Sequence, residues 1–383
     1  MRLGVYCDYS YRVDAQGAIT AELPFSIFVE ALAAHFDALI VIGREDTRRD
    51  PYPYPVVEAR LVGLPHYGSG ADVTAVMRTI PAAIRRFWRA LDTLDVVWIL
   101  GPNPPQAIVF ALLARLRRRR VVLGVRQNLP ELIRHRRPNQ RLVLCAAVAL
   151  ELTFRALARR VPVVVVGPDL ARLYRHGRSV HTLLVSLLKR SDLLTTAEDA
   201  RRYDEPSLVM LSVGRLDPEK NPVLLADVLA GALSEDPRWR LEVCGDGPLA
   251  DALRARADEL GVGERMLMHG YVPIDGGLWD YYRRAHALVH VSMTEGVPQV
   301  ILEAFAARLP VVATAVGGVG ALVTGAGLLA APGDALAAAG ALNRLVADPG
   351  LRARLTEAGS ARAGAHTMDA ECSRVAGFLS TNS

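Results

Sequence analysis

The order of hydrophobic and polar residues divides the chain into short apolar runs and longer amphipathic segments. A short run rich in Val, Ile and Leu is typical of a buried strand. Apolar residues three and four positions apart are typical of a helix that faces a core. In the first half, the pattern predicts strands at residues 2–6, 38–42, 96–100, 121–125 and 163–166, and helices at 24–35, 81–91 and 106–117.

The second half repeats this alternation. Strands are predicted at 207–213, 240–244, 265–268, 287–290, 311–314 and 327–330, and helices at 222–233, 248–260, 278–284, 298–307, 334–347 and 349–363. Strands that alternate with helices form parallel sheets with helices on both faces. The sequence therefore predicts an α/β protein with two Rossmann-like, doubly wound parallel sheets. We expect a first domain at 1–195, a link within 191–205, a second domain at 206–365 and a last helix near 368–379.

Composition agrees with two globular domains. The chain has 383 residues, of which 51% are hydrophobic and 22% are charged, and this length exceeds what one ordinary core holds. The first residues lack the apolar segment of a signal peptide, and no stretch reaches the roughly 18 apolar residues of a spanning helix. The four cysteines form no Cys-x-x-Cys pair, which argues against a zinc site or disulfides. We therefore expect a cytoplasmic protein without a metal.

Charge is distributed unevenly between the halves. Residues 1–195 hold 28 Lys and Arg against 16 Asp and Glu, whereas the remainder holds 17 against 24. The densest basic cluster comprises Arg115, Arg117, Arg118, Arg119 and Arg120, followed by Arg134, Arg136 and Arg137. This cluster is either a solvated helix end or a surface for anionic lipid or a phosphorylated acceptor. A nucleic-acid partner is disfavoured, because no binding motif or interleaved aromatic residue accompanies the charge.

Three loops of the second half carry candidate chemistry, because ligands of open α/β sheets bind beyond the carboxyl ends of strands. The first loop holds Gly214, Arg215 and Lys220. Two of the 45 Lys and Arg residues are lysines, so a lysine in a turn here suggests a specific task. Arginine offers a fixed fork and lysine a mobile point charge, and a diphosphate can use both. The alternative is that both cations form surface ion pairs with Asp217 and Glu219.

The second loop, Gly245-Asp246-Gly247, allows close approach of a ligand to the backbone or forms an ordinary tight turn. The third loop runs from Glu295 and Gly296 into a helix that Pro298 begins. The N–H groups of Val297 and Gln299 and the positive end of the helix can bind an anion. Glu303 lies farther along the same helix. The two carboxylates suit sugar hydroxyls, although each is also an ordinary residue of a helix.

Together these loops resemble the retaining, GT-B-fold glycosyltransferases of family 4 (glycosyltransferases group 1). The Gly-Arg…Lys loop, the Gly-Asp-Gly turn and the Glu-x7-Glu pair occur there in this order. The stretches 269–272 (His-Gly-Tyr-Val) and 310–318 resemble further family signals. The similarity is strong over about 207–331 and moderate before it. The resemblance implies two domains that face each other across a cleft, and a final helix, about 366–383, that returns to the first, acceptor-side domain.

The resemblance also implies roles for individual residues. Arg215, Lys220 and Glu295 would be catalytic: the two cations would neutralise the leaving diphosphate, and Glu295 would lie near the donor sugar. Glu303 would hold the ribose, and Tyr271 and Val272 would line the base pocket. The other expected donor contacts are Gly214, Asp246, Gly247, Gly296, Val297, Pro298 and Gln299. The family uses no Asp-x-Asp metal motif, and the chain has none. A nucleotide sugar, most frequently a UDP-sugar in the family, would be a co-substrate, with no cofactor.

The chain departs from the family pattern in its first half. The family's Gly-Gly pair is reduced to Gly17, which is a candidate donor contact. Relatives often place a His after the strand at 121–125, where this chain has Arg126 and Gln127. Both are candidate acceptor-side residues, and either is a candidate for the role of that His. Arg126 is equally a candidate for binding an acidic acceptor, or is one more arginine of an Arg-rich chain. These departures leave the sugar and the acceptor open.

The competing interpretations differ in chemistry. A non-transferring user of the fold, such as a nucleotide-sugar epimerase, needs an acid/base pair over the sugar, and none is evident beyond Glu295. An inactive relative that only binds nucleotide sugar would be expected to lack Lys220 or one of the paired glutamates, and all are present. For a transferase, the acceptor is a lipid-linked or polysaccharide intermediate reached by peripheral contact with an anionic membrane, or a small secondary metabolite.

Overall fold

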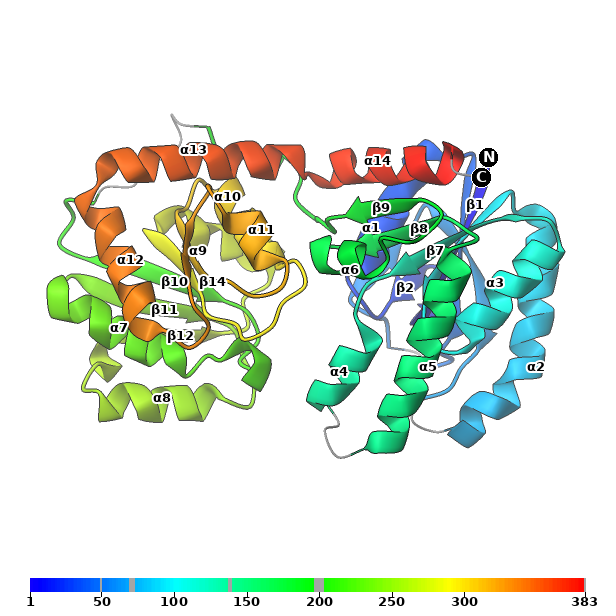
Figure 1. The fold of residues 1–383 in the computed structure, drawn as a ribbon, viewed down its shortest axis with the longest axis horizontal. Helices are drawn as coiled ribbons and strands as arrows, with labels where there is room; N and C mark the ends of the chain where they lie inside the picture. The colour runs from blue at the N-terminus through cyan, green and yellow to red at the C-terminus, as the bar shows by residue number, and fades with distance from the viewer. Residues whose placement is uncertain (49, 69–72, 137–139, 196–202, 382–383) are drawn as a thin grey trace. The chain divides into compact units, whose positions relative to one another are not determined.

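The structure is a computed structural model, and it describes residues 1–48, 50–68, 73–136, 140–195 and 203–381. The chain forms two compact units (Figure 1): unit 1 comprises Met1–Leu187 and Met368–Ser383, and unit 2 comprises Leu188–Thr367. The division after Leu187 precedes the expected link at 191–205, of which residues 196–202 lie outside the described residues. Within the described residues, no helix combines the length and the apolar character needed to cross a membrane.

Unit 1 contains a sheet in which β5, β3, β1, β6, β7, β8 and β9 run parallel, in that order. The far end of β1 pairs antiparallel with β2, and β2 pairs antiparallel with β4. The strands are β1 (Arg2–Val13), β2 (Ile19–Ala21), β3 (Ala38–Glu45), β4 (Tyr54–Val56), β5 (Ala59–Pro65), β6 (Val96–Gly101), β7 (Arg120–Val125), β8 (Val163–Val166) and β9 (Val180–Leu183).

Helices cover both faces of this sheet (Figure 1). They are α1 (Phe25–Ala31), η1 (Leu32–His35), α2 (Val73–Ala90), η2 (Leu91–Thr93), α3 (Gln106–Leu116), α4 (Leu129–Arg136), α5 (Arg141–Ala158), α6 (Pro168–Leu173) and α14 (Met368–Thr381). The buried residues of α14, among them Cys372 and Leu379, join the core that contains Leu3 and Phe28. The last helix therefore belongs to unit 1 although unit 2 precedes it in sequence.

The expectation that a helix begins at Pro81 is wrong, because Pro81 lies inside α2, which already begins at Val73. A proline inside a helix leaves the carbonyl of the residue four positions earlier without its amide donor. That residue is Met77, whose side chain is exposed. A lost bond on the solvent side of a helix can be replaced by water, so the proline does not end the helix.

Unit 2 contains a six-stranded parallel sheet of order β12-β11-β10-β13-β14-β15. The chain order reverses between β10 and β13, which creates a topological switch point. The strands are β10 (Leu208–Val213), β11 (Trp239–Cys244), β12 (Met266–Gly270), β13 (Ala287–His290), β14 (Val311–Thr314) and β15 (Leu328–Ala330). The two parallel-sheet units have the α/β fold that the sequence predicts.

The helical segments of unit 2 are η3 (Arg190–Asp192), η5 (Pro218–Lys220), α7 (Leu224–Glu235), α8 (Ala250–Glu259), η6 (Gly263–Arg265), η7 (Ile274–Gly276), α9 (Leu278–Arg284), α10 (Gln299–Ala306), α11 (Val319–Val323), α12 (Ala335–Ala347) and α13 (Pro349–Ala365). Neighbouring residues of β10 point to opposite cores. Met210 packs with α7, α8 and α12, whereas Leu211 packs with α9, α10 and α11. Because both faces are covered, the strands read as continuous apolar runs, and their carboxyl ends are left for polar loops.

Candidate active site

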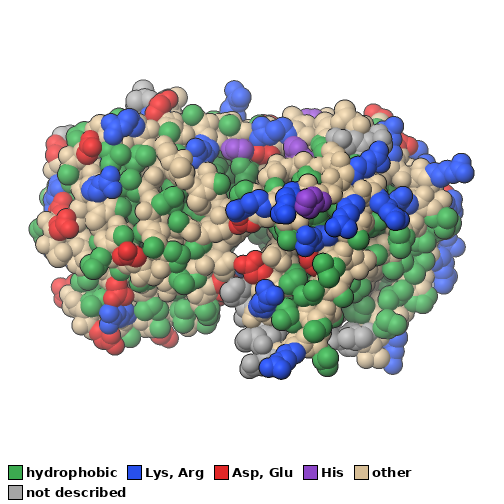
Figure 2. All heavy atoms as spheres, viewed as in Figure 1, with side chains coloured by type: hydrophobic (Ala, Val, Ile, Leu, Met, Phe, Trp, Pro, Cys, Tyr) green, Lys and Arg blue, Asp and Glu red, His purple; other side chains and the backbone are tan. Residues whose placement is uncertain are grey.

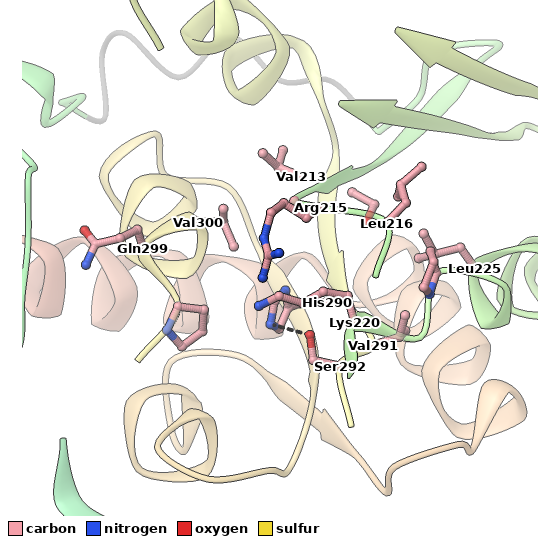
Figure 3. A pocket seen from close by; sticks show the side chains of 14 residues that line it. Val213, Arg215, Leu216, Lys220, Leu225, His290, Val291, Ser292, Gln299 and Val300 are labelled. Carbon is pink, nitrogen blue, oxygen red and sulfur yellow. Dashed lines mark hydrogen bonds between the residues drawn. The ribbon is translucent and has the colours of Figure 1, made fainter. Parts of the chain in front are cut away.

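A pocket of about 200 Å³ lies at the switch point of unit 2, beyond the ends of β10 and β13 (Figure 3). It is lined by Ser212, Val213, Gly214, Arg215, Leu216, Lys220, Pro222, Leu225, His290, Val291, Ser292, Pro298, Gln299 and Val300. Five residues singled out from the sequence therefore line one pocket: Gly214, Arg215, Lys220, Pro298 and Gln299. Figure 3 shows the Arg215 side chain extending toward His290 and Lys220.

The loops after β10 and β11 are joined by backbone hydrogen bonds. The Gly214 N–H donates to Cys244 O (3.0 Å), and the Leu216 N–H donates to Asp246 O (2.9 Å). A Cβ at Gly245 would lie 1.8 Å from Gly214 O, and one at Gly247 would lie 2.8 Å from the Leu216 backbone. In this structure the glycines of the Gly-Asp-Gly turn thus make room for the loop that carries Arg215, which the sequence had not indicated.

Arg215 is a cation held by its own loop. Its side chain is 65% exposed and pairs with Asp217 and Glu219. Ion pairs in such exposed positions exchange readily with solvent. The guanidinium is therefore accessible to an anion, and the surface ion pairs considered as the alternative are present for Arg215.

Lys220 has a different partner. Its ammonium pairs with the Glu295 carboxylate, and the two side chains are 24% and 8% exposed. Two further contacts connect their loops: the Met293 N–H donates to Glu219 O (2.9 Å), and the Asn221 side-chain amide donates to Met293 Sδ (3.7 Å). Asn221 has a left-handed conformation (φ 51°) and closes the turn after Lys220. The loop after β13 thus fixes the position of the lysine. The alternative that Lys220 forms a surface ion pair with Asp217 or Glu219 is wrong, because its partner is Glu295.

Glu295 accepts three side-chain donors at one carboxylate oxygen. Besides Lys220, the Ser292 hydroxyl donates to Glu295 Oε1 (2.8 Å), and His290 Nε2 lies 2.9 Å from it. Burial raises the pKa of Glu295, but the hydrogen bond from His290 and the charge of Lys220 outweigh it and lower the pKa to about 2. The Thr314 hydroxyl donates to Ser292 O (2.6 Å) and anchors this loop to β14. Glu295 is therefore an ionised, rigidly oriented acceptor at neutral pH.

The third loop leads into α10, which begins at Gln299 with Pro298 as its N-cap residue. Pro298 and Gln299 line the pocket at this positive helix end. Gly296 and Val297 do not line it. Gly296 instead approaches the turn after β14, where a Cβ at Gly318 would lie 2.1 Å from Gly296 O.

Glu303 lies on α10 but is not among the residues that line the pocket. The hydroxyl of the fully buried Tyr282 donates to Glu303 Oε2 (2.7 Å). Burial raises the pKa of Glu303, the Tyr282 hydrogen bond lowers it, and the nearby Asp192 charge raises it further. The two glutamates thus have opposite environments, because Glu295 is surrounded by cationic and hydroxyl donors and Glu303 by apolar surface and an acid.

The remaining predicted donor contacts of unit 2 also lie outside the pocket lining. Asp246 is exposed, and its carboxylate accepts from the Gly247 N–H (2.7 Å). Tyr271 is 76% exposed, whereas Val272 packs against the core of α9 and α10. These residues keep their assigned roles as predictions.

Three predicted residues belong to unit 1. Gly17 (φ 85°) lies in the exposed turn between β1 and β2. Arg126 directly follows β7, and its guanidinium lies over the Phe25 ring, 4.3 Å from the centroid. Gln127 is exposed. Of the basic cluster, Arg137 lies outside the described residues.

His290 and Ser292 are site residues that were not predicted from the sequence. Both lie at the end of β13, and both contact Glu295. A Ser three residues before a Glu, directly after an apolar strand, was the available signal. Within the described residues, no group of three or more His, Cys, Asp or Glu could hold a metal ion.

Residues 195–362 match the model of the family described as glycosyl transferases group 1. This stretch includes the whole pocket lining.

Two curated relatives align with part of the chain. The D-inositol 3-phosphate glycosyltransferase of Acidothermus cellulolyticus is 38% identical over 182 residues, which is 44% of this chain and 40% of the relative. The Vi polysaccharide biosynthesis protein VipC/TviE of Salmonella typhi is 35% identical over 100 residues, which is 26% of this chain and 17% of the relative. Each alignment thus spans less than half of the relative.

The similarity to solved structures extends over the whole chain. Anabaena HepE in complex with UDP superposes with a TM-score of 0.72 at 17% identity and covers 100% of both chains. At this identity the likeness concerns the fold. Each of the two units has an α/β fold with a parallel sheet, as the sequence predicts.

Proposed function

We propose that the protein is a retaining glycosyltransferase that moves a sugar from a nucleoside diphosphate, UDP in the first instance, to an acceptor hydroxyl. The observation that carries the proposal is the pocket at the switch point of unit 2. Two cations of different kinds, Arg215 and Lys220, line it together with the start of α10. A diphosphate is the ligand that uses a planar fork, a point charge and a helix N-terminus at once.

The reaction breaks the bond between the anomeric carbon and a β-phosphate oxygen, and forms a bond between that carbon and the acceptor oxygen. Negative charge grows on the departing diphosphate, and the acceptor proton passes to that phosphate. Cations held before the reaction begins stabilise this charge without reorganisation. Arg215 and Lys220 supply them in our proposal, so the transfer needs no metal ion from the protein.

Glu295 has a role that follows from its contacts. A donor diphosphate would compete with it for Lys220. Glu295 would still keep Ser292 and His290 as partners when the lysine turns to phosphate. It would thus stay ionised and fixed, as an acceptor of sugar hydroxyls or a stabiliser of positive charge at the anomeric carbon.

The comparisons support the donor and acceptor classes differently. HepE was crystallised with UDP, which favours uracil as the base. One relative is named for an inositol phosphate acceptor and another for polysaccharide biosynthesis. We therefore propose a polysaccharide or lipid-linked intermediate as the acceptor, with a small phosphorylated molecule as the alternative.

Ligand-dependent thermal unfolding tests the donor site. UDP, GDP, ADP and dTDP are added to the wild type, to Lys220→Ala and to Lys189→Ala, a matched control because Lys189 is the exposed second lysine of the chain. At about 100-fold above Kd, a bound nucleotide stabilises by roughly 2.7 kcal/mol. We expect one nucleotide to stabilise the wild type and Lys189→Ala but not Lys220→Ala. No stabilisation by any nucleotide, or equal stabilisation of all three proteins, would refute the proposed site.

Unit 1 suits peripheral contact with an anionic membrane. It holds 27 Lys and Arg against 17 Asp and Glu, and Lys and Arg gather on the face of unit 1 seen in Figure 2. On α5, Leu142 and Leu152 are 87% and 56% exposed. Apolar side chains beside basic ones are typical of a helix that binds a lipid surface. Flotation with phosphatidylglycerol vesicles, but not phosphatidylcholine vesicles, should carry the wild type and lose Leu142→Ser/Leu152→Ser; equal flotation would refute the contact.

A further inference from the structure

Arg126 occupies an unusual place in unit 1. It directly follows β7, at the carboxyl end of the sheet. Its guanidinium lies over two aromatic rings, 4.3 Å from the Phe25 centroid and 5.5 Å from that of Tyr9. Phe25 is itself held by Trp98, edge to face at 6.2 Å. The rings form a rigid floor, so the guanidinium has a defined orientation.

The other part-buried arginines at this end of the sheet are paired. Arg12 binds Asp46, and Arg44 pairs with Asp8 at 3.4 Å. Arg126 makes neither an ion pair nor a hydrogen bond with the described residues of the chain. Burial lowers the pKa of Arg126, and Cys7 offsets this in part. A guanidinium removed from water without an acceptor costs free energy, so the structure bears a cost that a bound anion would remove.

No carboxylate among the described residues pairs with Arg126. The Tyr9 hydroxyl is buried and lacks a partner among the described residues. Asp8, on the same strand, is engaged by Arg44 and by the Tyr67 hydroxyl (2.7 Å). Donors without acceptors select a ligand that accepts hydrogen bonds, and a guanidinium fork selects a planar or tetrahedral oxyanion.

We infer that Arg126, resting on Phe25 and Tyr9, binds an oxyanion on the acceptor substrate, either a phosphate monoester or a carboxylate. This inference rests on the proposed function for the word acceptor, and on unit 1 alone for the anion site. The fork binds two oxygens of the anion. Transfer would then favour an acidic acceptor over its neutral analogue.

Binding is measured by calorimetry without nucleotide, so that the site is tested apart from the donor pocket. The probes are glucose 6-phosphate, glucuronate and neutral glucose, which separate phosphate from carboxylate and both from the sugar. The proteins are the wild type, Arg126→Gln, Arg126→Lys and, as a control, Arg160→Gln, which removes an exposed arginine of unit 1. UDP titrations of each protein report the donor pocket independently.

We expect one acidic probe to bind the wild type and Arg160→Gln, and glucose not to bind. Arg126→Gln should weaken that binding at least tenfold, because a charged hydrogen-bond pair is lost. Arg126→Lys should fall in between, because it keeps the charge without the fork. UDP binding should be unchanged in all variants. Arg126→Gln should stay folded, since it loses the contacts with the two rings but no ion pair or hydrogen bond with the described residues.

Two results would overturn the inference: no binding of either acidic probe to the wild type, or equal binding to the wild type and Arg126→Gln. Equal loss in Arg160→Gln would also overturn it, because general basicity would then explain the binding. Absence of UDP binding together with Arg126-dependent anion binding would refute the proposed function and keep the anion site. UDP binding without Arg126-dependent anion binding would refute the anion site and leave the proposed function standing.

Discussion

The Lys220 ammonium pairs with the Glu295 carboxylate, although 75 positions of sequence separate the two residues. Each belongs to a loop that follows a strand of unit 2, and those strands, β10 and β13, are neighbours in the sheet. The switch point of the sheet brings the two loops together. Before any donor binds, the pair neutralises a cation that would otherwise face an empty pocket.

The first prediction concerns acid stability. The pKa of Glu295 is about 2 against an ordinary 4.5, a difference equivalent to roughly 3 kcal/mol. A lowered pKa stabilises the fold above the unfolded-state value, and this stability is lost as pH falls from about 4.5 to about 2. Glu295→Gln should therefore destabilise at pH 7 and converge with the wild type in acid. Urea unfolding across pH measures the difference, with the exposed Glu264→Gln as the control. A pH-independent difference would contradict the proposed charge state.

Glu303 should behave in the opposite way. Burial raises its pKa, so the folded state resists ionising it. As pH rises above the ordinary pKa of 4.5, the unfolded chain ionises Glu303 more readily than the folded protein, so the free energy of unfolding falls. Below that pH, Glu303 is protonated in both the folded and the unfolded protein, and stability is unaffected. Relative to the wild type, Glu303→Gln should therefore gain stability as pH rises from about 4.5. Tyr282→Phe removes the hydrogen bond that lowers the pKa of Glu303, so Glu303 should ionise at higher pH in this variant than in the wild type. The readout is unfolding by urea at matched pH values, and a flat profile for Glu303→Gln would exclude the raised pKa.

The sequence predicted most of unit 2 and less of unit 1, for a physical reason. The strands at 287–290 and 311–314 were predicted with their observed bounds, because strands covered on both faces appear as plain apolar runs. In the part of the chain that the structure describes, β5 pairs with β3 alone, and β2 and β4 have three residues each. β5 contains Gly63 and ends at Pro65, two residue types that are depleted in strands, and three residues carry no period. Such strands form because β1, β3 and β2 present partners to β2, β5 and β4 in turn, which depends on tertiary structure.

The site was predictable to the same extent. Lys220 and Glu295 could be picked out as separate residues, because each lies in a loop after a predicted strand. Lys220 also stands out as one of two lysines in the sequence. Their contact depends on the strand order, which a sequence of this kind does not state. The Gly-Asp-Gly turn shows the same limit. A glycine in a turn indicates that another group approaches its backbone, but it does not identify that group. In this structure the group is the backbone of Gly214 and Leu216, and not a ligand.

A third prediction follows from that close approach. A Cβ at Gly245 would overlap Gly214 O, so Gly245→Ala should displace the loop that carries Arg215. We expect a loss of about 1–3 kcal/mol in the free energy of unfolding and weaker UDP binding. Gly340→Ala is the matched control, since Gly340 lies inside α12 and a Cβ there meets nothing within 4 Å. It should stabilise by roughly 0.5–1 kcal/mol. Equal effects of both alanines in urea unfolding would rule out the steric account.

The last prediction separates the two cations of the pocket. Arg215 is 65% exposed and pairs with acids of its own loop, so Arg215→Gln should change unfolding free energy by less than about 0.5 kcal/mol. Lys220→Ala leaves the buried Glu295 without its cation and should destabilise clearly. Both variants remove a donor aimed at the leaving diphosphate, so each should lower kcat by about 10²–10³. Transfer kinetics and urea unfolding of the same preparations test the pair. If Arg215→Gln lost stability as Lys220→Ala does, the loop of Arg215 would be held by its ion pairs, and its cation would not be free for a donor.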